Sequence, residues 1–292
     1  MIYRLLYFFL KLLSYIPLRV LYVLSDGLFY LLYYLVRYRR KIVRRNLTES
    51  FPGKSLPEIR KIEKKFYRFF ADTIFEICKM PSMSLEEISR RMKFTNVETI
   101  NAILKQGKTV SVYMGHYGNW EWVTFIPLYL EKEIVAAQIY RKLRNKSMDK
   151  LMSHNRERMG SVCVEMRKTA RYINEMAAHH KAGIIGFVAD QSPRKREVRH
   201  FVQFLHHKTP VLTGTEKITK HYGFEAWYLN IKRVKRGYYE AEFIQIHENP
   251  QSLPDFELTA LYYQLLEQAI LRQPELYLWT HNRFKHAQKS DT

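Results

Sequence analysis

The chain has 292 residues, of which 47% are hydrophobic and 26% charged, and this composition is typical of a globular protein rather than a disordered one. Lysine and arginine number 48 against 28 aspartates and glutamates, a formal net charge of +20. An excess of this size indicates an anionic partner, such as a nucleic acid, an anionic membrane face, or an acidic substrate or carrier protein. The two cysteines could form at most one bridge, which excludes a disulfide framework and favours a reducing compartment.

The N-terminal residues 1–36 are apolar and aromatic almost throughout. Six cations without an acid among them follow directly: Arg37, Arg39, Arg40, Lys41, Arg44 and Arg45. A cleaved signal peptide fits poorly, because Lys11 interrupts the apolar run and no small-x-small cleavage site follows. The segment 20–36 is 17 residues long and contains Asp26, which is the short limit for a membrane span.

Three interpretations of this segment remain open. It could be a marginal transmembrane anchor, a helix lying in the membrane interface with its basic end on anionic headgroups, or a core helix followed by a solvated charged turn. If the helix spans, the cations that follow it keep the rest of the chain in the cytoplasm.

A long amphipathic helix is predicted next. Ser55 and Glu58 have the spacing of a capping box, and apolar residues then recur at three- and four-residue steps up to a stop near Pro81. Short apolar runs that resemble strands follow at 109–114, 134–139, 184–189, 225–230 and 239–246.

Stretches of helical length lie between most of these strands. This alternation predicts an α/β fold with a mixed, largely parallel sheet flanked by helices. Because no Pro/Gly/Ser-rich linker divides the chain, we expect an N-terminal anchor with its basic segment at 1–45 and one domain of catalytic size at 46–292. Ligands bind beyond the carboxyl ends of the strands in such folds, so we expect the chemistry in the strand-to-helix loops.

One of these loops carries a histidine and a carboxylate. The run from Gly115 to Trp122 follows the strand at 109–114 and places His116 at the rim of the sheet. Glu121 falls in the first turns of the expected next helix, where the helix dipole favours a carboxylate that can hydrogen-bond the imidazole. The chain has no GxSxG nucleophile elbow. The nucleophile could therefore be the substrate's own hydroxyl, with His116 as general base, Glu121 orienting it, and an acyl thioester as the electrophile. A purely structural histidine is the alternative.

The run Gly-His-Tyr-Gly-Asn-Trp-Glu resembles the HX4(D/E) signature of the lysophospholipid acyltransferase superfamily, in the form found in the bacterial lipid A late acyltransferases. Further blocks that resemble this family follow in order along almost the whole chain: Arg45-Asn46-Leu47 with Phe51-Pro52, Tyr140-Arg141, Arg158-Met159-Gly160, Asp190-Gln191, Phe201 to Phe204, and Trp279 to Phe284. The chain departs from many relatives at Phe-Val-Gln-Phe, where they carry a Phe-Phe-Gly turn, and at Asn282, where they carry arginine.

The resemblance implies a glycerolipid acyltransferase-like fold behind an N-terminal hydrophobic membrane-anchor helix. It also implies an O-acyltransferase that moves a fatty acyl chain from acyl carrier protein, or alternatively coenzyme A, directly to a hydroxyl of a lipid A precursor. We expect no cofactor and no metal, and a location at the bacterial inner membrane with the catalytic domain on the cytoplasmic side. The expected partners are the carrier protein, anionic membrane lipid and a lipid A-type acceptor.

Two alternatives to this function are kept. The same chemistry could act on a lysophospholipid, an aminolipid or another glycolipid, or the chain could be a non-catalytic basic membrane-binding protein. Nucleic-acid binding is not expected, because the sequence shows no zinc finger, RNP1-like stretch or GXXG loop.

Five residues are predicted to bind substrate, more from the resemblance than from their spacing: Asn119, Arg141, Arg158, Asp190 and Gln191. The two arginines lie in a stretch with ten cations and three acids, and their guanidinium groups suit an acceptor that carries phosphates. Asp190 and Gln191 follow the strand at 184–189, although Asp190 could instead cap the turn before Pro193. The terminal Trp279–Arg283 block is expected either to support the site or to pack in the core.

Overall fold

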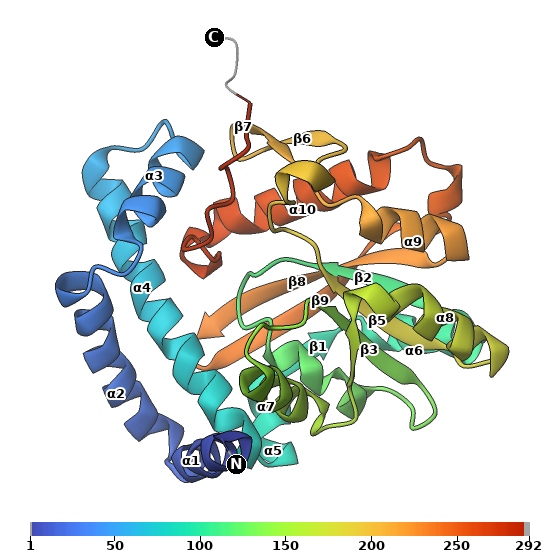
Figure 1. Ribbon diagram of the computed structural model, residues 1–292, viewed down its shortest axis with the longest axis horizontal. Helices are drawn as coiled ribbons and strands as arrows, with labels where there is room; N and C mark the ends of the chain where they lie inside the picture. Colours follow the sequence, from blue (N-terminus) through green and yellow to red (C-terminus); the bar gives the residue numbers. More distant parts are fainter. Residues whose placement is uncertain (1, 289–292) are drawn as a thin grey trace.

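The computed structural model describes residues 2–288. It begins with two helices, α1 (Ile2–Tyr15) and α2 (Leu18–Tyr30), and a π-helical turn, η1 (Leu31–Leu35). The apolar segment expected at 20–36 corresponds to α2 with η1, and α1 is a separate helix that ends before Pro17, since proline lacks the N–H that would continue it. Figure 1 shows α1 and α2 at an angle to one another, along one side of the molecule.

The helix α4 (Leu56–Lys79) is the support against which the N-terminal helices pack. Its predicted capping box is confirmed, because the Ser55 backbone N–H donates to Glu58 Oε2 at 2.8 Å. Apolar side chains of α2, including Leu21 and Phe29, are buried in the same core as those of α4 and the sheet. The short helix α3 (Arg40–Ser50) joins this group and carries the basic segment.

The central sheet confirms the α/β class with a mostly parallel arrangement (Figure 1). Within the described residues its strand order is β1-β9-β8-β2-β5-β3-β4, and only the β8–β9 pair is antiparallel. The strands are β1 (Met92–Thr95), β2 (Val110–Met114), β3 (Val135–Tyr140), β4 (Val162–Glu165), β5 (Gly183–Val188), β8 (Glu225–Lys235) and β9 (Tyr238–His247). A separate antiparallel hairpin is formed by β6 (Phe201–Phe204) and β7 (His207–Pro210).

Helices cover both faces of the sheet. They are α5 (Leu85–Arg91), α6 (Val97–Lys105), the 3₁₀ helix η3 (Trp122–Tyr129), α7 (Lys146–Glu157), α8 (Thr169–Ala178), α9 (Gly214–Tyr222) and α10 (Glu257–Arg272). On one face, Ile173 of α8 packs in a cluster with Phe187 of β5, and Tyr262 of α10 packs against Tyr113 of β2. On the other face, η3 lies over the sheet, between the sheet and α4.

The segment after the candidate catalytic loop differs from the expected α-helix. It is the 3₁₀ helix η3, and Pro127 lies inside it. Proline removes a helical hydrogen bond and disfavours continuous α-helix, which accounts for the difference.

Candidate active site

His116 and Asp190 lie at the carboxyl ends of two adjacent parallel strands. In the β2–β5 pair Met114 is opposite Val188, and the Ala189 N–H donates to the Met114 carbonyl at 3.1 Å. Continuing this register by two residues brings His116 opposite Asp190. The strand pairing therefore brings the two side chains to the same edge of the sheet, as expected for a ligand site in this fold class.

Both ring nitrogens of His116 have partners. Nδ1 lies 2.7 Å from Asp190 Oδ1, and Nε2 lies 3.1 Å from Gln191 Nε2. Because a carboxylate only accepts hydrogen bonds, Nδ1 carries the proton and Nε2 is left to accept from the Gln191 amide. Nε2 is therefore unprotonated and bonded to Gln191, and 20% of the His116 side chain is accessible.

Asp190 is held in its ionised form. Burial opposes ionisation of this carboxyl, but the electrostatic interaction and the hydrogen bonds with His116 outweigh it, and the pKa of Asp190 is lowered. Since only 2% of the Asp190 side chain is exposed, its charge acts on the imidazole with little screening by water.

The strand ends beneath this pair are fixed by α10. The Tyr262 hydroxyl donates to the Met114 carbonyl at 3.0 Å and the Tyr263 hydroxyl to the Ala189 carbonyl at 3.1 Å. Arg283, which is 1% exposed, donates to the Tyr263 hydroxyl. The terminal block therefore supports the strand ends and is buried in the core, so both of its expected roles are realised.

The loop itself is bonded to the C-terminal segment. The Leu278 N–H donates to the His116 carbonyl and the Gly118 N–H to the Leu276 carbonyl, both at 3.0 Å. Gly118 has φ +62°, and a Cβ there would lie 2.5 Å from Ile231 Cγ2. Only glycine fits this close approach without strain.

Glu121 does not bond His116, which corrects the expected dyad. Its two oxygens accept from Arg156 of α7, at 2.8 Å from Nε and 2.6 Å from Nη2. The pKa of Arg156 is raised, because the hydrogen bond and charge of Glu121 outweigh the effect of burial. Glu121 is the residue just before η3, so this ion pair ties the start of η3 to α7.

Asn119, which is predicted to bind substrate, is fully buried in the structure. Its Nδ2 donates to Glu76 Oε2 at 2.7 Å, and its Oδ1 accepts from the Trp122 N–H at 3.2 Å. Both ends of the amide are thus bonded within the protein.

Neither of the two arginines predicted to bind phosphate is hydrogen-bonded to His116. Arg158 donates to the carbonyls of Met80 and Met83, at 2.8 and 2.7 Å, and so supports the turn after α4. Arg141 is half exposed and lies 3.9 Å from Glu197, so its guanidinium is still accessible to an anion. Asp190 and Gln191, also predicted to bind substrate, both contact His116.

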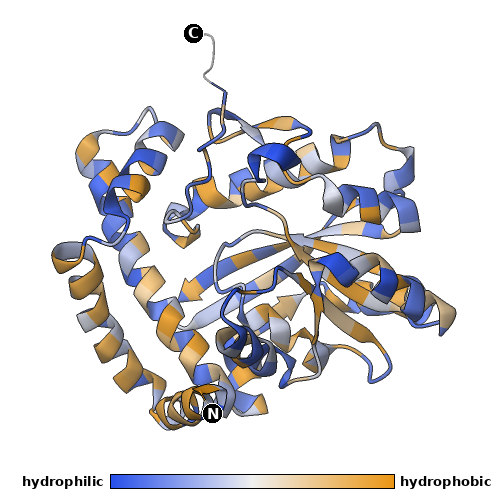
Figure 2. Cartoon of the chain, viewed as in Figure 1, coloured by the Kyte–Doolittle hydropathy of each residue, from blue (hydrophilic) through white to orange (hydrophobic). Residues whose placement is uncertain are grey.

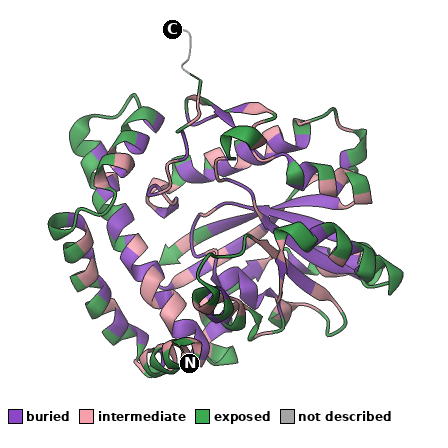
Figure 3. Cartoon of the chain, in the orientation of Figure 1, coloured by how far each residue is buried: buried purple, intermediate pink, exposed green. Residues whose placement is uncertain are grey.

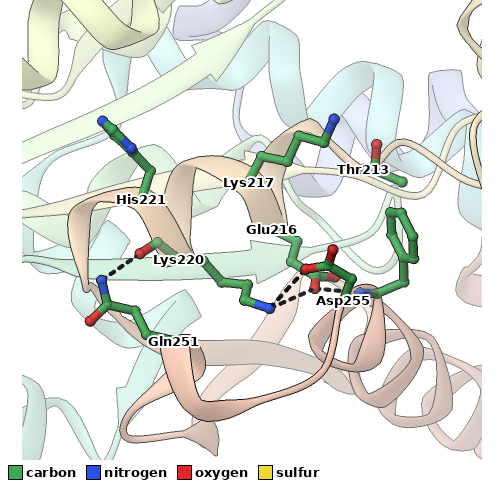
Figure 4. A pocket seen from close by; sticks show the side chains of 8 residues that line it. Thr213, Glu216, Lys217, Lys220, His221, Gln251 and Asp255 are labelled. Carbon is green, nitrogen blue, oxygen red and sulfur yellow. Dashed lines mark hydrogen bonds and ion pairs between the residues drawn. The ribbon is translucent and has the colours of Figure 1, made fainter.

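The surface pocket in Figure 4 is separate from this cluster. It has a volume of about 370 Å³ and is lined by residues of α9 and of the segment before α10, including Glu216, Lys220 and Asp255. Its lining includes none of the residues around His116. Among residues 2–288, no group of three or more His, Cys, Asp or Glu side chains is placed to hold a metal ion.

An imidazole with an orienting carboxylate and an unprotonated nitrogen is equipped for general-base catalysis when an incoming hydroxyl replaces the Gln191 amide at that nitrogen. Among the described residues, no protein hydroxyl or thiol is hydrogen-bonded to His116.

Comparison with known families is consistent with a site for general-base catalysis on a hydroxyl. Residues 1–286 match the model of the bacterial lipid A biosynthesis acyltransferases, and the chain belongs to this family. A lipid A biosynthesis acyltransferase of Haemophilus influenzae is 23% identical over 213 residues, which are 73% of this chain and 65% of that protein, just under two thirds of its length. A lipid A biosynthesis palmitoleoyltransferase of Escherichia coli K12 is 23% identical over 249 residues, 85% of this chain and 79% of that protein.

Proposed function

We propose that this chain is a membrane-bound O-acyltransferase that moves a fatty acyl chain from acyl carrier protein to a hydroxyl of a lipid A precursor. Membership of the family supports the reaction class. The observation that carries the site assignment is the His116 imidazole, which is held at Nδ1 by Asp190 and has an unprotonated Nε2 that accepts from the Gln191 amide.

The proposed step balances without a cofactor. The acceptor hydroxyl replaces the Gln191 amide at Nε2, and His116 takes its proton as the oxygen attacks the thioester carbonyl. The tetrahedral intermediate then expels the carrier thiolate, which receives the proton back from His116, so that an ester and a free thiol are the products. Asp190 stabilises the imidazolium in between, without itself taking the proton.

We propose acyl carrier protein as the acyl donor because the chain is strongly positively charged. Four cations follow β3 and are exposed: Arg141, Lys142, Arg144 and Lys146. Together with the net charge of +20, they favour encounter with an acidic protein. They lie just beyond the carboxyl end of β3, which neighbours β5 in the sheet, and so flank the edge that carries Asp190.

The membrane contact is proposed to be made by the outward faces of α1 and α2. Figures 2 and 3 show that these helices are hydrophobic over most of their length and yet exposed on the side away from α4. Large apolar side chains on this side are between 46% and 69% exposed: Ile2, Leu5, Phe8, Phe9, Leu12, Val20, Val23 and Leu24. A patch of this extent marks a contact surface.

The same helices are proposed to lie in the interface rather than to cross the bilayer. Residues 18–35 are long and apolar enough to span, but 28% of that stretch is buried in the protein. Ser25 donates to the α4 carboxylate Asp72, and two α4 cations, Lys64 and Arg68, lie over the rings of Tyr34 and Phe29. A spanning α2 would carry these charges into hydrocarbon, whereas an in-plane helix leaves them at headgroup level.

The reaction is tested by incubating the full-length protein in membranes with acyl carrier protein loaded with a labelled acyl chain and a lipid A precursor. We expect the product to gain one acyl ester by mass spectrometry, and His116→Ala to abolish the gain. His179→Ala replaces an exposed histidine and serves as the matched control with full activity. Transfer by His116→Ala at the wild-type rate would refute the proposed role of His116.

A further inference from the structure

Glu76 of α4 is a fully buried carboxyl group outside the His116 cluster, and burial raises its pKa although hydrogen bonds from Tyr239 and Tyr22 oppose this. It is 0% exposed and accepts three side-chain hydrogen bonds, from the Tyr22 hydroxyl at 2.8 Å, the Asn119 amide at 2.7 Å and the Tyr239 hydroxyl at 2.7 Å. Its backbone carbonyl also accepts from Trp122 Nε1 at 3.2 Å. Burial of a carboxylate costs several kcal/mol unless donors surround it in this way.

These contacts join three parts of the molecule. Tyr22 comes from α2, Tyr239 comes from β9, and Asn119 comes from the loop between β2 and η3. The Glu76 carboxyl group is therefore the point at which the N-terminal helices and the catalytic loop are bonded to one group.

Asn119 links Glu76 to the backbone of the loop by hydrogen bonds at both ends of its side-chain amide. While its Nδ2 is held by Glu76, its Oδ1 accepts from the Trp122 N–H, at the first residue of η3. Glu121 lies between these two residues, and His116 lies three positions before Asn119. If Asn119 lost its partner, its amide could rotate, and the turn that connects His116 to η3 would lose its support on the α4 side.

We propose that Glu76 is a positioning residue for acyl transfer, which acts through Asn119 to fix the turn between His116 and η3. The proposal rests on the proposed function, since the geometry of His116 matters only if His116 performs proton transfer. A displacement of a catalytic group by about 1 Å can lower turnover by about 10²-fold.

A neighbouring carboxylate provides the matched control. Asp72 lies one helical turn before Glu76, is 2% exposed, and bonds Ser25 of α2 together with Arg233 and Arg236 of the β8–β9 hairpin. It thus connects the same helices and the same hairpin, but none of its partners belongs to the catalytic loop.

The test compares an isosteric pair at each position in the full-length protein. Glu76→Gln keeps an oxygen that can accept from Asn119, whereas Glu76→Met keeps the volume and removes the acceptor. We expect Glu76→Met to lower kcat about 10- to 100-fold at nearly unchanged KM, and Glu76→Gln to stay within a few-fold of wild type. Asp72→Asn and Asp72→Leu should both lower the free energy of unfolding, but the kcat values of these two variants should be similar to each other.

A double variant separates positioning from simple stability. Asn119→Leu alone leaves Glu76 with one unused acceptor site and the Trp122 N–H without its side-chain acceptor, and Glu76→Met alone leaves Asn119 Nδ2 and the Tyr22 and Tyr239 hydroxyls without theirs. Combining them removes both partners, so stability should partly recover, while kcat should stay as low as in the worse single variant. Recovery of kcat together with stability would overturn the proposal, as would equal kcat in Glu76→Met and Glu76→Gln.

Hydrogen exchange gives a readout that does not need activity. Peptides covering residues 115–122 should exchange faster in Glu76→Met and Asn119→Leu, but not in Asp72→Leu; equal exchange in all three would count against Glu76. An inactive wild type, or an active His116→Ala, would refute the proposed function, and the exchange experiment would still decide the role of Glu76 in holding the loop.

Discussion

Asp190 Oδ1 lies 2.7 Å from His116 Nδ1, although the two residues are 74 positions apart in the sequence. The contact is produced by the pairing of β2 with β5, because each residue comes two positions after its strand ends. This carboxylate, rather than Glu121 five residues after the histidine, holds the imidazole. Glu121 is committed to Arg156 by two hydrogen bonds.

The first prediction concerns this ion pair. Glu121→Gln would leave the Arg156 guanidinium, which is 19% exposed, without its counter-charge. We expect a loss of about 1–3 kcal/mol in the free energy of unfolding, measured by urea denaturation in detergent. The double variant Glu121→Leu with Arg156→Met should recover most of this loss, because neither charge is then left unpaired. A double variant less stable than both single ones would show that the pair does not act as a unit.

The second prediction concerns membrane binding. Deletion of residues 1–36 would expose the core that Leu21 and Phe29 help to cover, so point changes on the outer face are more informative. Replacing Phe8 and Phe9, which are 55% and 58% exposed, by glutamate should strongly reduce co-sedimentation with anionic vesicles at unchanged thermal stability. Binding at the wild-type level would mean that another surface attaches the protein.

The third prediction concerns the acyl donor. Charge reversal at Lys142 and Arg144, both exposed, should raise KM for acyl carrier protein by a few-fold each, and the effect should weaken as salt is added. Reversal at Lys132, an exposed cation before β3, serves as the control. KM for an acyl-coenzyme A donor should change little, because a small thioester does not cover this surface. Equal effects on the two donors would assign these cations to the membrane or to acceptor phosphates.

The fourth prediction concerns pH. Burial, with the charges of His206, Arg283 and Arg45, lowers the pKa of His207 from 6.5 to about 4. Between these pH values the unfolded chain binds a proton that the folded chain does not, so stability falls as the pH falls through this window, by ~1.4 kcal/mol for each pKa unit.

His207→Phe isolates this contribution, because His207 stacks on Phe284 with ring centroids 3.8 Å apart and phenylalanine can keep the stacking. The variant should resemble wild type at pH 7.5 and lose less stability between pH 6.5 and 4. Parallel curves for the two proteins over this range would show that His207 does not contribute to the acid sensitivity.

The general architecture could be predicted from the sequence because hydrophobic patterning determines it. The capping box at Ser55 and the strands β2, β3, β5, β8 and β9 are found close to their expected positions. The strands β1 and β4 have only four residues each, too few to show a period.

The site could be predicted only in part, since contacts between loops depend on strand order. The sequence predicts His116 on a loop at the rim of the sheet, where the structure has it, and predicts Asp190 at the same rim as a substrate ligand. The signal that could have joined them is their common offset from two buried strands, provided that β2 and β5 are neighbours. Arg156 and Glu76 gave no local signal, because one lies in a run of cations and the other on the face of a long amphipathic helix.

The measurement that tests the central claim most directly is the kcat of Asp190→Asn beside that of Glu121→Gln, in acyl transfer from carrier protein to a lipid A precursor. An asparagine at position 190 can hold the wrong imidazole tautomer and cannot stabilise the imidazolium, so we expect a loss on the order of 10³- to 10⁴-fold at nearly unchanged stability. Glu121→Gln, corrected for its folded fraction, should retain far more activity. The opposite order, with Asp190→Asn near wild type and Glu121→Gln inactive while folded, would contradict the account and restore Glu121 as the partner of His116.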